Sequence, residues 1–399
     1  MPALTHSMEK MMDLLCDPAF DAGTANPLKE INDLTDAIVQ QLHDGMAASE
    51  IDEALAAAAR RLSGVSPRGW FVALLLGVLV EYGGNPDITG GGLLAWFPRI
   101  ADGCVAFYKR CAELLEGDRE VAGAIAERAE QAQAEGAGYD LADYIREEGW
   151  EAVVKRCHDE INAENRHACR AQNCQMRYQL ALMAHLSRSK QLRALARAKP
   201  EYLEKAWDLY GAMLGEGDLV VKMLRVQDDE PLLVLHPGER KGYAVRISGI
   251  AVNFELNLLI MQRLIGDPQA GWLTGDALDK DIADCEETFT AQYNLWNWPG
   301  LQPDGTVPDD GYGRNERREG ESLAQAASRD WIWNEGVPAD ILRFDGTRVV
   351  LLGPPPYTRS FYGGRLFPHM EPEFVVEKKL TREEVDDCLK EIARAGRNG

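Results

Sequence analysis

The residues between Cys157 and Cys174 are the first place in this sequence to look for chemistry. Glu164 and His167 have the Glu-x-x-His spacing with which helical bundles present two iron ligands on one face. A di-iron site needs this pair twice, and the sequence contains it once. A zinc site from Cys157, His167 and Cys174 needs a helix break near residue 165, because the three positions are far apart along one axis. We therefore predict no metal or other cofactor, and keep Glu164 and His167 as the candidates for a metal-dependent site.

A basic stretch follows at residues 165–199. It contains eight Lys and Arg side chains and no acidic one, although the formal net charge of the chain is -21. The eight are Arg166, Arg170, Arg177, Arg188, Lys190, Arg193, Arg197 and Lys199. On a helix, the first three lie near one line, and Arg193 and Arg197 lie near another. This pattern predicts a docking surface for an acidic partner, a nucleic acid or an anionic ligand.

An intramolecular explanation of the basic stretch competes with docking. Residues 112–164 hold 15 acidic side chains and 5 basic ones. This acidic segment could lie antiparallel against the basic stretch and neutralise it within the chain. The two explanations differ in whether the arginines pair with acidic residues of the same chain.

A second candidate site lies among the aromatic residues near the C-terminus. A pocket could be lined by Arg359, Arg365 and His369 together with five tryptophans of this domain: Trp272, Trp296, Trp298, Trp331 and Trp333. Rigid aromatic walls with a few hydrogen-bond donors suit an anionic or planar ligand. The alternative is that the tryptophans pack the interior of a domain that is rich in loops.

Composition excludes several classes of protein. The acidic balance argues against a general nucleic-acid binder, because phosphate is repelled by a negative field. The apolar run at residues 69–80 is shorter than the roughly 20 residues that cross a bilayer, and the first ten residues lack the pattern of a signal peptide. Eight scattered cysteines without a Cys-x-x-Cys pair are typical of reduced thiols. We expect a cytoplasmic protein without a membrane segment.

The first half of the chain is helical in pattern. Helices are predicted over residues 26–42, 49–62, 67–82, 98–116, 119–135, 139–147 and 200–214. Residues 150–199 contain no Gly or Pro and predict either one long helix or two that meet near 162–175. The three glycines at 90–92 predict a flexible turn.

The pattern changes after residue 217. Strands are predicted at 219–226, 232–236, 243–248, 341–344, 347–352 and 373–378. The strands on either side of Asp345-Gly346 predict a hairpin. Helices are predicted at 252–265, 276–290 and 381–395, and a long loop at 294–320. The fold class is therefore α+β, with an all-helical domain at 1–215 and a mixed α+β domain at 216–399.

The leading functional hypothesis is a non-enzymatic binding protein that presents the basic stretch, about 166–197, to an acidic protein. The alternative is an enzyme whose pocket contains the aromatic and Arg/His set of the second domain. No nucleophile motif such as Gly-x-Ser-x-Gly or His-Glu-x-x-His occurs. The sequence leaves open whether the protein is an enzyme and what its oligomeric state is.

Overall fold

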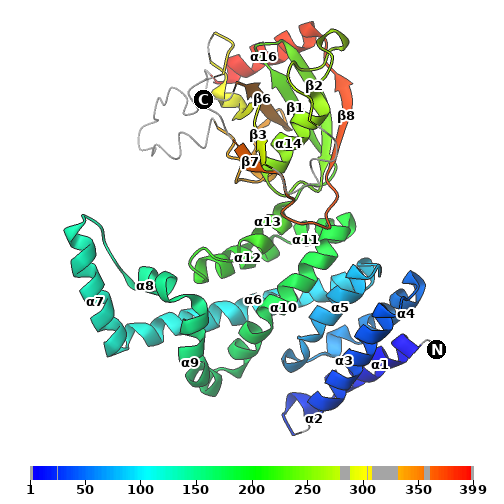
Figure 1. The fold of residues 1–399 in the computed structure, drawn as a ribbon, viewed down its shortest axis with the longest axis vertical. Coiled ribbons are helices and arrows are strands. Elements are labelled where there is room, and N and C mark those ends of the chain that lie inside the picture. The colour runs from blue at the N-terminus through cyan, green and yellow to red at the C-terminus, as the bar shows by residue number, and fades with distance from the viewer. Residues whose placement is uncertain are drawn as a thin grey trace. The chain divides into compact units, whose positions relative to one another are not determined.

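The chain folds into two compact units, Met1–Leu224 and Arg225–Gly399 (Figure 1). The first consists of helices and the second contains a mixed sheet, which confirms the predicted α+β class. The structure, a computed structural model, describes residues 3–24, 26–278, 288–302, 304–307, 331–354 and 360–396. None of the helices in these ranges is both long and apolar enough to cross a membrane.

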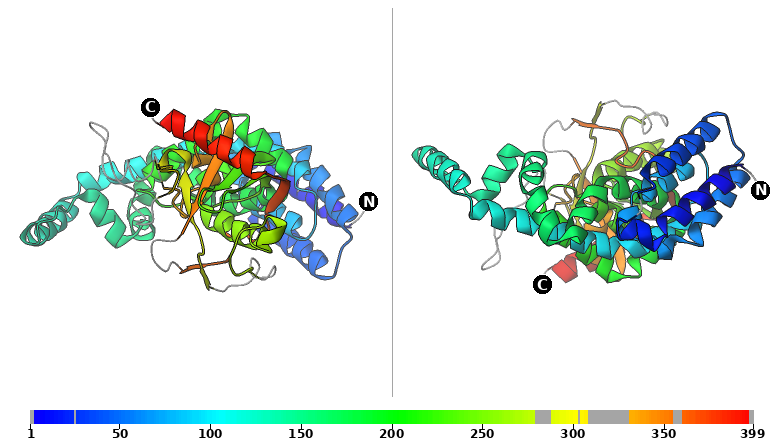
Figure 2. Two further views of the ribbon diagram at one scale, coloured as in Figure 1. Left: turned by 90° about the horizontal axis from the view of Figure 1, so that it is seen from above. Right: turned by 90° about the horizontal axis from the view of Figure 1, so that it is seen from below.

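The first unit is built from helices of very different lengths. Their bounds are Ala3–Leu15 (α1), Pro18–Asp21 (α2), Leu28–His43 (α3), Ala48–Ala59 (α4), Val72–Glu81 (α5), Asp87–Glu116 (α6), Arg119–Ala134 (α7), Leu141–Glu148 (α8), Trp150–Glu164 (α9), Arg166–Arg188 (α10), Lys190–Arg197 (α11), Pro200–Ala212 (α12) and Leu219–Arg225 (α13). Helix α1 lies beside α3 and α4 (Figures 1 and 2). Helix α10 packs along both α5 and α6 and is the central helix of this unit.

Small residues allow α10 to approach its neighbours closely. A Cβ atom on Gly77 of α5 would lie 2.8 Å from the Ala181 Cα, and one on Gly103 of α6 would lie 2.5 Å from the Ala171 Cβ. The hydroxyl of Tyr178, on the same face of α10, donates to the Leu93 carbonyl at 2.8 Å. This buried face of α10 fixes the direction in which the opposite face points.

Residues 150–199 form three helices, α9, α10 and α11. The first break, at Asn165, falls in the range predicted for two helices that meet, and the second, at Ser189, was not predicted. Both break residues cap the helix that follows. The Asn165 Oδ1 accepts from the Ala168 amide at 3.1 Å, and the Ser189 Oγ accepts from the Leu192 amide at 3.0 Å.

The predicted turn at residues 90–92 is wrong, because these glycines lie inside α6. Their role is close packing rather than chain reversal. A Cβ on Gly90 would lie 2.2 Å from the Leu192 Cδ1, and one on Gly92 would lie 2.7 Å from the Leu62 Cδ1. The tertiary contacts thus override the weak helix propensity of glycine.

The predicted strand at 219–226 is also wrong, because residues 219–225 form α13. One helical turn separates Asp218 from Lys222, and their side chains form an ion pair at 2.6 Å. Val220 and Val221 are both buried. Adjacent buried valines are compatible with a short helix as well as with a strand, so composition alone misassigned this segment. The two units divide at 224/225.

The second unit contains a mixed sheet and a separate strand pair. The strands are Glu230–His236 (β1), Lys241–Ser248 (β2), Thr288–Thr290 (β3), Asn294–Asn297 (β4), Arg343–Phe344 (β5), Thr347–Gly353 (β6), Ser360–Tyr362 (β7) and Glu373–Lys379 (β8). In the described part of the chain the sheet order is β4-β6-β1-β2-β8, with β5 also paired to β6. Only the β1–β6 pairing is parallel among these; β3 and β7 pair antiparallel with each other.

Two helices cover the two faces of this sheet (Figure 1). Helix α14, Asn253–Leu264, packs Leu256 and Ile260 against one face, where Val234 and Val350 point. Helix α16, Arg382–Gly396, packs on the face to which the neighbouring strand residues point. The alternation of strand side chains between two apolar layers follows from the period of two in a β-strand.

Several local predictions for the second unit are confirmed. The hairpin pairs Phe344 with Thr347, and Asp345 and Gly346 both have positive φ, as its tight turn requires. Residues 252–265, ambiguous by pattern, contain the predicted helix α14. The capping box before α16 is present: the Glu384 amide donates to the Thr381 Oγ1 at 3.2 Å.

Two other predictions for this unit need correction. The helix expected over 276–290 is wrong at its end, where residues 288–290 form β3; residues 279–287 lie outside the described ranges. The loop expected over 294–320 begins instead with β4. The apolar residues of β4 pair with β6 and complete the sheet edge, which a sequence rich in Trp, Pro and Gly does not reveal. Residues 303 and 308–320 lie outside the described ranges.

Candidate binding surfaces

Two arginines of the basic stretch are exposed on α10. The side chains of Arg166 and Arg177 make no hydrogen bond or ion pair with any residue in the described ranges. Eleven residues separate them, close to three helical turns, so they share one side of α10 about 16 Å apart along the axis. These are the basic side chains that remain free to bind something else.

Two exposed apolar side chains lie close to Arg177 on α10. Met176 is 69% exposed and Leu180 is 55% exposed, both unusual for side chains of their size on a packed helix. Helical spacing places them within about 100° of Arg166, Asn173 and Arg177. We call these five residues the basic–apolar face of α10. The sequence analysis identified its charges but not its apolar members.

The other basic candidates have structural partners. Arg170 donates to the Asp21 carboxylate at 3.0 Å and to the Asp21 carbonyl at 3.3 Å, which ties α10 to α2. Arg193 is buried, and its guanidinium donates to the Leu186 carbonyl at 2.6 Å. Arg193 therefore does not belong to a docking surface: it satisfies a carbonyl left open at the end of α10. Arg197 is only partly exposed.

The acidic segment at 112–164 does not neutralise the basic–apolar face. Its carboxylates pair instead with arginines close to them in the first unit. Glu164 accepts from Arg110 at 2.9 and 3.0 Å, and Arg110 also binds Glu113. Asp118 pairs with Arg156, and this interaction lowers the pKa of the Asp118 carboxyl. Among the described residues, none of these carboxylates reaches Arg166 or Arg177, so the intramolecular explanation does not account for these two arginines.

The metal candidates Glu164 and His167 have other roles. Both Glu164 oxygens bind Arg110, which lowers the pKa of this carboxyl. The ring of His167 packs edge-on against Trp70, with centroids 5.5 Å apart. Within the described ranges, no three His, Cys, Asp or Glu side chains gather in a way that could hold a metal ion.

In the second unit, three tryptophans form a ladder that runs from the interior to the surface. Trp296 on β4 is fully buried and stacks on Trp331 at 5.6 Å. Trp331 stacks in turn on Trp333 at 5.2 Å, with the two planes 14° apart, and Trp333 is 41% exposed. Trp298 stands apart from this ladder, packs on Phe344 and donates to the Arg343 carbonyl at 3.1 Å. Of the five tryptophans considered from the sequence, Trp296, Trp331 and Trp333 stack together, whereas Trp298 packs on Phe344 and Trp272 stacks on Tyr243.

A cavity of about 300 Å³ lies beside this ladder, at the end of β4. Its lining combines Trp331 and Trp333 with the amides of Asn253 and Asn297 and the carboxylate of Asp340. Gly336 and two isoleucines complete it. We call this the Trp–Asn cavity.

Buried amide atoms without hydrogen-bond partners occur in the lining of the Trp–Asn cavity and in the helix and loop that supply it. The Oδ1 atom of Asn253, which lines the cavity, has no partner within the described residues; neither does the Asn257 Oδ1 on the same helix, nor either amide atom of Asn334, which follows Trp333 in the chain. Each such buried polar atom costs roughly 1–3 kcal/mol when left unsatisfied. A protein accepts this cost most readily at a functional site. Asn253 and Asn257, four residues apart in a helix that is mostly apolar, are the sequence signal that could have identified this region.

Two of the cationic residues predicted for this pocket, Arg365 and His369, lie outside the cavity lining. Arg365 donates to the Glu371 carboxylate at 3.1 Å, and His369 is exposed on the same loop. Neither contributes to the lining of the Trp–Asn cavity. Arg359 lies outside the described ranges. The described lining of this cavity therefore combines indole rings with two amides and the Asp340 carboxylate, and contains no cation.

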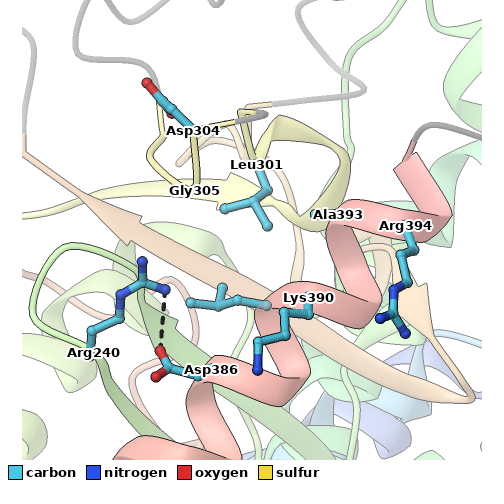
Figure 3. A pocket seen from close by; sticks show the side chains of 9 residues that line it. Arg240, Leu301, Asp304, Gly305, Asp386, Lys390, Ala393 and Arg394 are labelled. Atoms are coloured by element: carbon cyan, nitrogen blue, oxygen red, sulfur yellow. Dashed lines mark ion pairs between the residues drawn. The ribbon is translucent and has the colours of Figure 1, made fainter.

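A second cavity, of about 510 Å³, lies between α16 and the β1–β2 turn (Figure 3). It has basic side chains from Arg240, Lys390 and Arg394. Arg240 binds Asp386 at 3.3 Å across this cavity, and Lys390 binds Asp387 at 2.9 Å. These local ion pairs explain most of its charge, so we assign it no ligand.

Comparison with known proteins identifies no relative: no family model, curated protein or solved structure matches the chain.

Proposed function

We propose that this chain is a cytoplasmic, non-enzymatic binding protein whose basic–apolar face docks an acidic, amphipathic helix of a partner protein. One observation carries the proposal: Arg166 and Arg177 are exposed and free of partners among the described residues, and the exposed Met176 and Leu180 adjoin Arg177 on the same side of α10. Isolated exposed apolar residues are common, but here two of them adjoin two free cations.

The chemistry of this face selects the partner. Each guanidinium offers a planar fork of donors that matches a carboxylate. Met176 is flexible and adapts to apolar surfaces of different shape, and Leu180 adds buried area on binding. A partner helix with apolar residues at helical spacing and carboxylates about 16 Å apart satisfies both features.

The net charge of -21 affects how fast the two proteins associate more than it affects the contacts they make once bound. An acidic partner is repelled by the whole chain at long range, but salt at physiological strength screens charges beyond roughly 8 Å. The arginines act at contact distance, where screening is weak. The same negative field supports the prediction that the protein is not a general nucleic-acid binder.

Reversing the two free arginines tests the proposal. The Arg166→Glu/Arg177→Glu variant is expected to bind the partner at least about 100-fold more weakly, because each lost charge-assisted hydrogen bond contributes about 1.5 kcal/mol and each new carboxylate repels. The partner is first captured with the wild-type chain from its own cytoplasm, cross-linked and identified. Its affinity for both chains is then measured by titration calorimetry.

A charge-matched control is available. Arg119 and Arg382 are also exposed arginines without a described partner, and they lie on α7 and α16. The Arg119→Glu/Arg382→Glu variant changes the net charge equally and is expected to bind normally. Equal losses in both double variants, or a captured protein without an acidic helix, would refute the docking proposal.

A further inference from the structure

We infer that the Trp–Asn cavity of the second unit binds a neutral sugar ring. This site is separate from the basic–apolar face, and the inference holds whether or not α10 docks a protein. It rests on the aromatic wall, on the pattern of donors and acceptors, and on the charge of the lining.

The aromatic wall is rigid and reaches solvent. Trp333 stacks on Trp331, which stacks on Trp296, so the exposed indole is fixed by two buried ones. The backbone carbonyl of Trp333 also accepts from the Asn253 Nδ2 at 2.8 Å. The face of an indole is negative because of its quadrupole. The polarised C–H hydrogens on one face of a pyranose ring complement such a surface.

The polar lining complements hydroxyl groups. Asn253 is 1% exposed, its Nδ2 is used by Trp333, and its Oδ1 has no partner within the described residues. The Asn297 Oδ1 accepts from the Leu342 amide at 2.9 Å, which orients its Nδ2 as a donor. Asp340 adds a carboxylate acceptor. A sugar hydroxyl both donates and accepts, so adjacent hydroxyls satisfy this mixed set.

Charge distinguishes a neutral sugar from a nucleotide or a sugar phosphate. Asp340 is the charged member of the described lining, and Arg225 pairs with it. The part of the lining that the structure describes therefore supplies no cation for a phosphate, and an anion would face the Asp340 carboxylate. A volume of about 300 Å³ is at the small end for ligand sites and suits one or two sugar units.

Gly336 keeps the cavity open. A Cβ atom at this position would lie 3.2 Å from both the Asn253 Nδ2 and the Trp333 carbonyl oxygen. The added methyl group would press on the hydrogen bond that holds Asn253 beside the indole. Gly336→Ala is thus a second, independent variant of the site that retains the tryptophan.

The test is a binding screen on the full chain. Saturation-transfer NMR is run with glucose, galactose, mannose, xylose, N-acetylglucosamine and their common disaccharides, with adenosine and inosine as neutral planar competitors. At least one saccharide is expected to bind saturably. Trp333→Ala is expected to lower the affinity of the chain for that saccharide about tenfold, since one aromatic stack contributes about 1.4 kcal/mol. Gly336→Ala is expected to lower the affinity for the same saccharide as well.

A matched control removes an exposed tryptophan elsewhere. Trp207 on α12 is 45% exposed, and Trp207→Ala is expected to leave saccharide binding unchanged. If Trp333→Ala does not fold, judged by circular dichroism, Gly336→Ala decides. The inference is overturned if no saccharide binds saturably, if Trp207→Ala causes the same loss, if Gly336→Ala binds normally, or if only the nucleosides bind.

Discussion

Replacing Gly77 and Gly103 together by alanine is expected to lower the free energy of unfolding of the first unit by roughly 2–4 kcal/mol. The two new methyl groups would lie 2.8 Å from the Ala181 Cα and 2.5 Å from the Ala171 Cβ. Overpacking costs roughly 1–3 kcal/mol per site, and the better helix propensity of alanine offsets about 1 kcal/mol of each. Because both contacts involve the backbone or a Cβ atom, neither can be relieved by a rotamer change, and the upper half of the range applies.

Replacement of Gly123, in the same unit, is expected to have the opposite effect on the free energy of unfolding. It also lies inside a helix, α7, but no atom is within 4 Å of the position of its missing Cβ. Gly123→Ala is therefore expected to raise the free energy of unfolding by about 0.5–1 kcal/mol. Urea denaturation followed by circular dichroism at 222 nm compares the variants. If the Gly77→Ala/Gly103→Ala variant and the Gly123→Ala variant change the free energy of unfolding equally, α10 does not pack tightly on α5 and α6.

Acid is expected to destabilise the first unit through His185. This residue is buried on α10; its Nδ1 donates to the Ala181 carbonyl at 2.7 Å, and its Nε2 accepts from the Thr89 hydroxyl at 2.8 Å. Burial, opposed by the hydrogen bond to Ala181, lowers the pKa of His185 to about 4. The imidazole is thus held in its neutral form.

The sign of the pH effect follows from proton binding. Unfolded His185 takes up a proton below about pH 6.5, whereas folded His185 does so only near pH 4. Between these values the unfolded state binds more protons, so stability falls as the pH falls. The loss from this residue is about 2 kcal/mol by pH 5 and about 3 kcal/mol by pH 4.

The control for this prediction is His185→Gln, which keeps a hydrogen-bonding side chain but does not titrate. Urea denaturation at pH 7, 6 and 5 is expected to show a steeper decline for the wild-type chain than for the variant. If the two stability curves run parallel, His185 is already protonated in the fold or is not buried as described.

Sequence patterns predicted the elements whose signals are local. The turn at Asp345-Gly346 and the capping box of Thr381 and Glu384 depend on a few consecutive residues, and both were found. The glycines at 90–92 were misassigned because their function is contact with Leu192 and Leu62, which are distant in sequence. Residues 219–225 were misassigned because adjacent buried valines fit either structure.

The candidate sites divide in the same way. Helical spacing correctly aligned Arg166 with Arg177, but it could not show that Arg193 turns inward to bind the Leu186 carbonyl. The Trp–Asn cavity depends on side chains from α14, β4 and the segments around Trp333 and Asp340. Their convergence is set by strand pairing and is invisible in composition.

Photo-cross-linking from α10 tests the central claim most directly. Met176, 69% exposed between the two free arginines, is replaced by p-benzoylphenylalanine in the living cell, and Trp207, on α12, is replaced in a second strain as the control. The account predicts one dominant product from position 176, containing an acidic protein cross-linked through an amphipathic helix, and its absence from position 207. No product from position 176, or the same product from both positions, would contradict it.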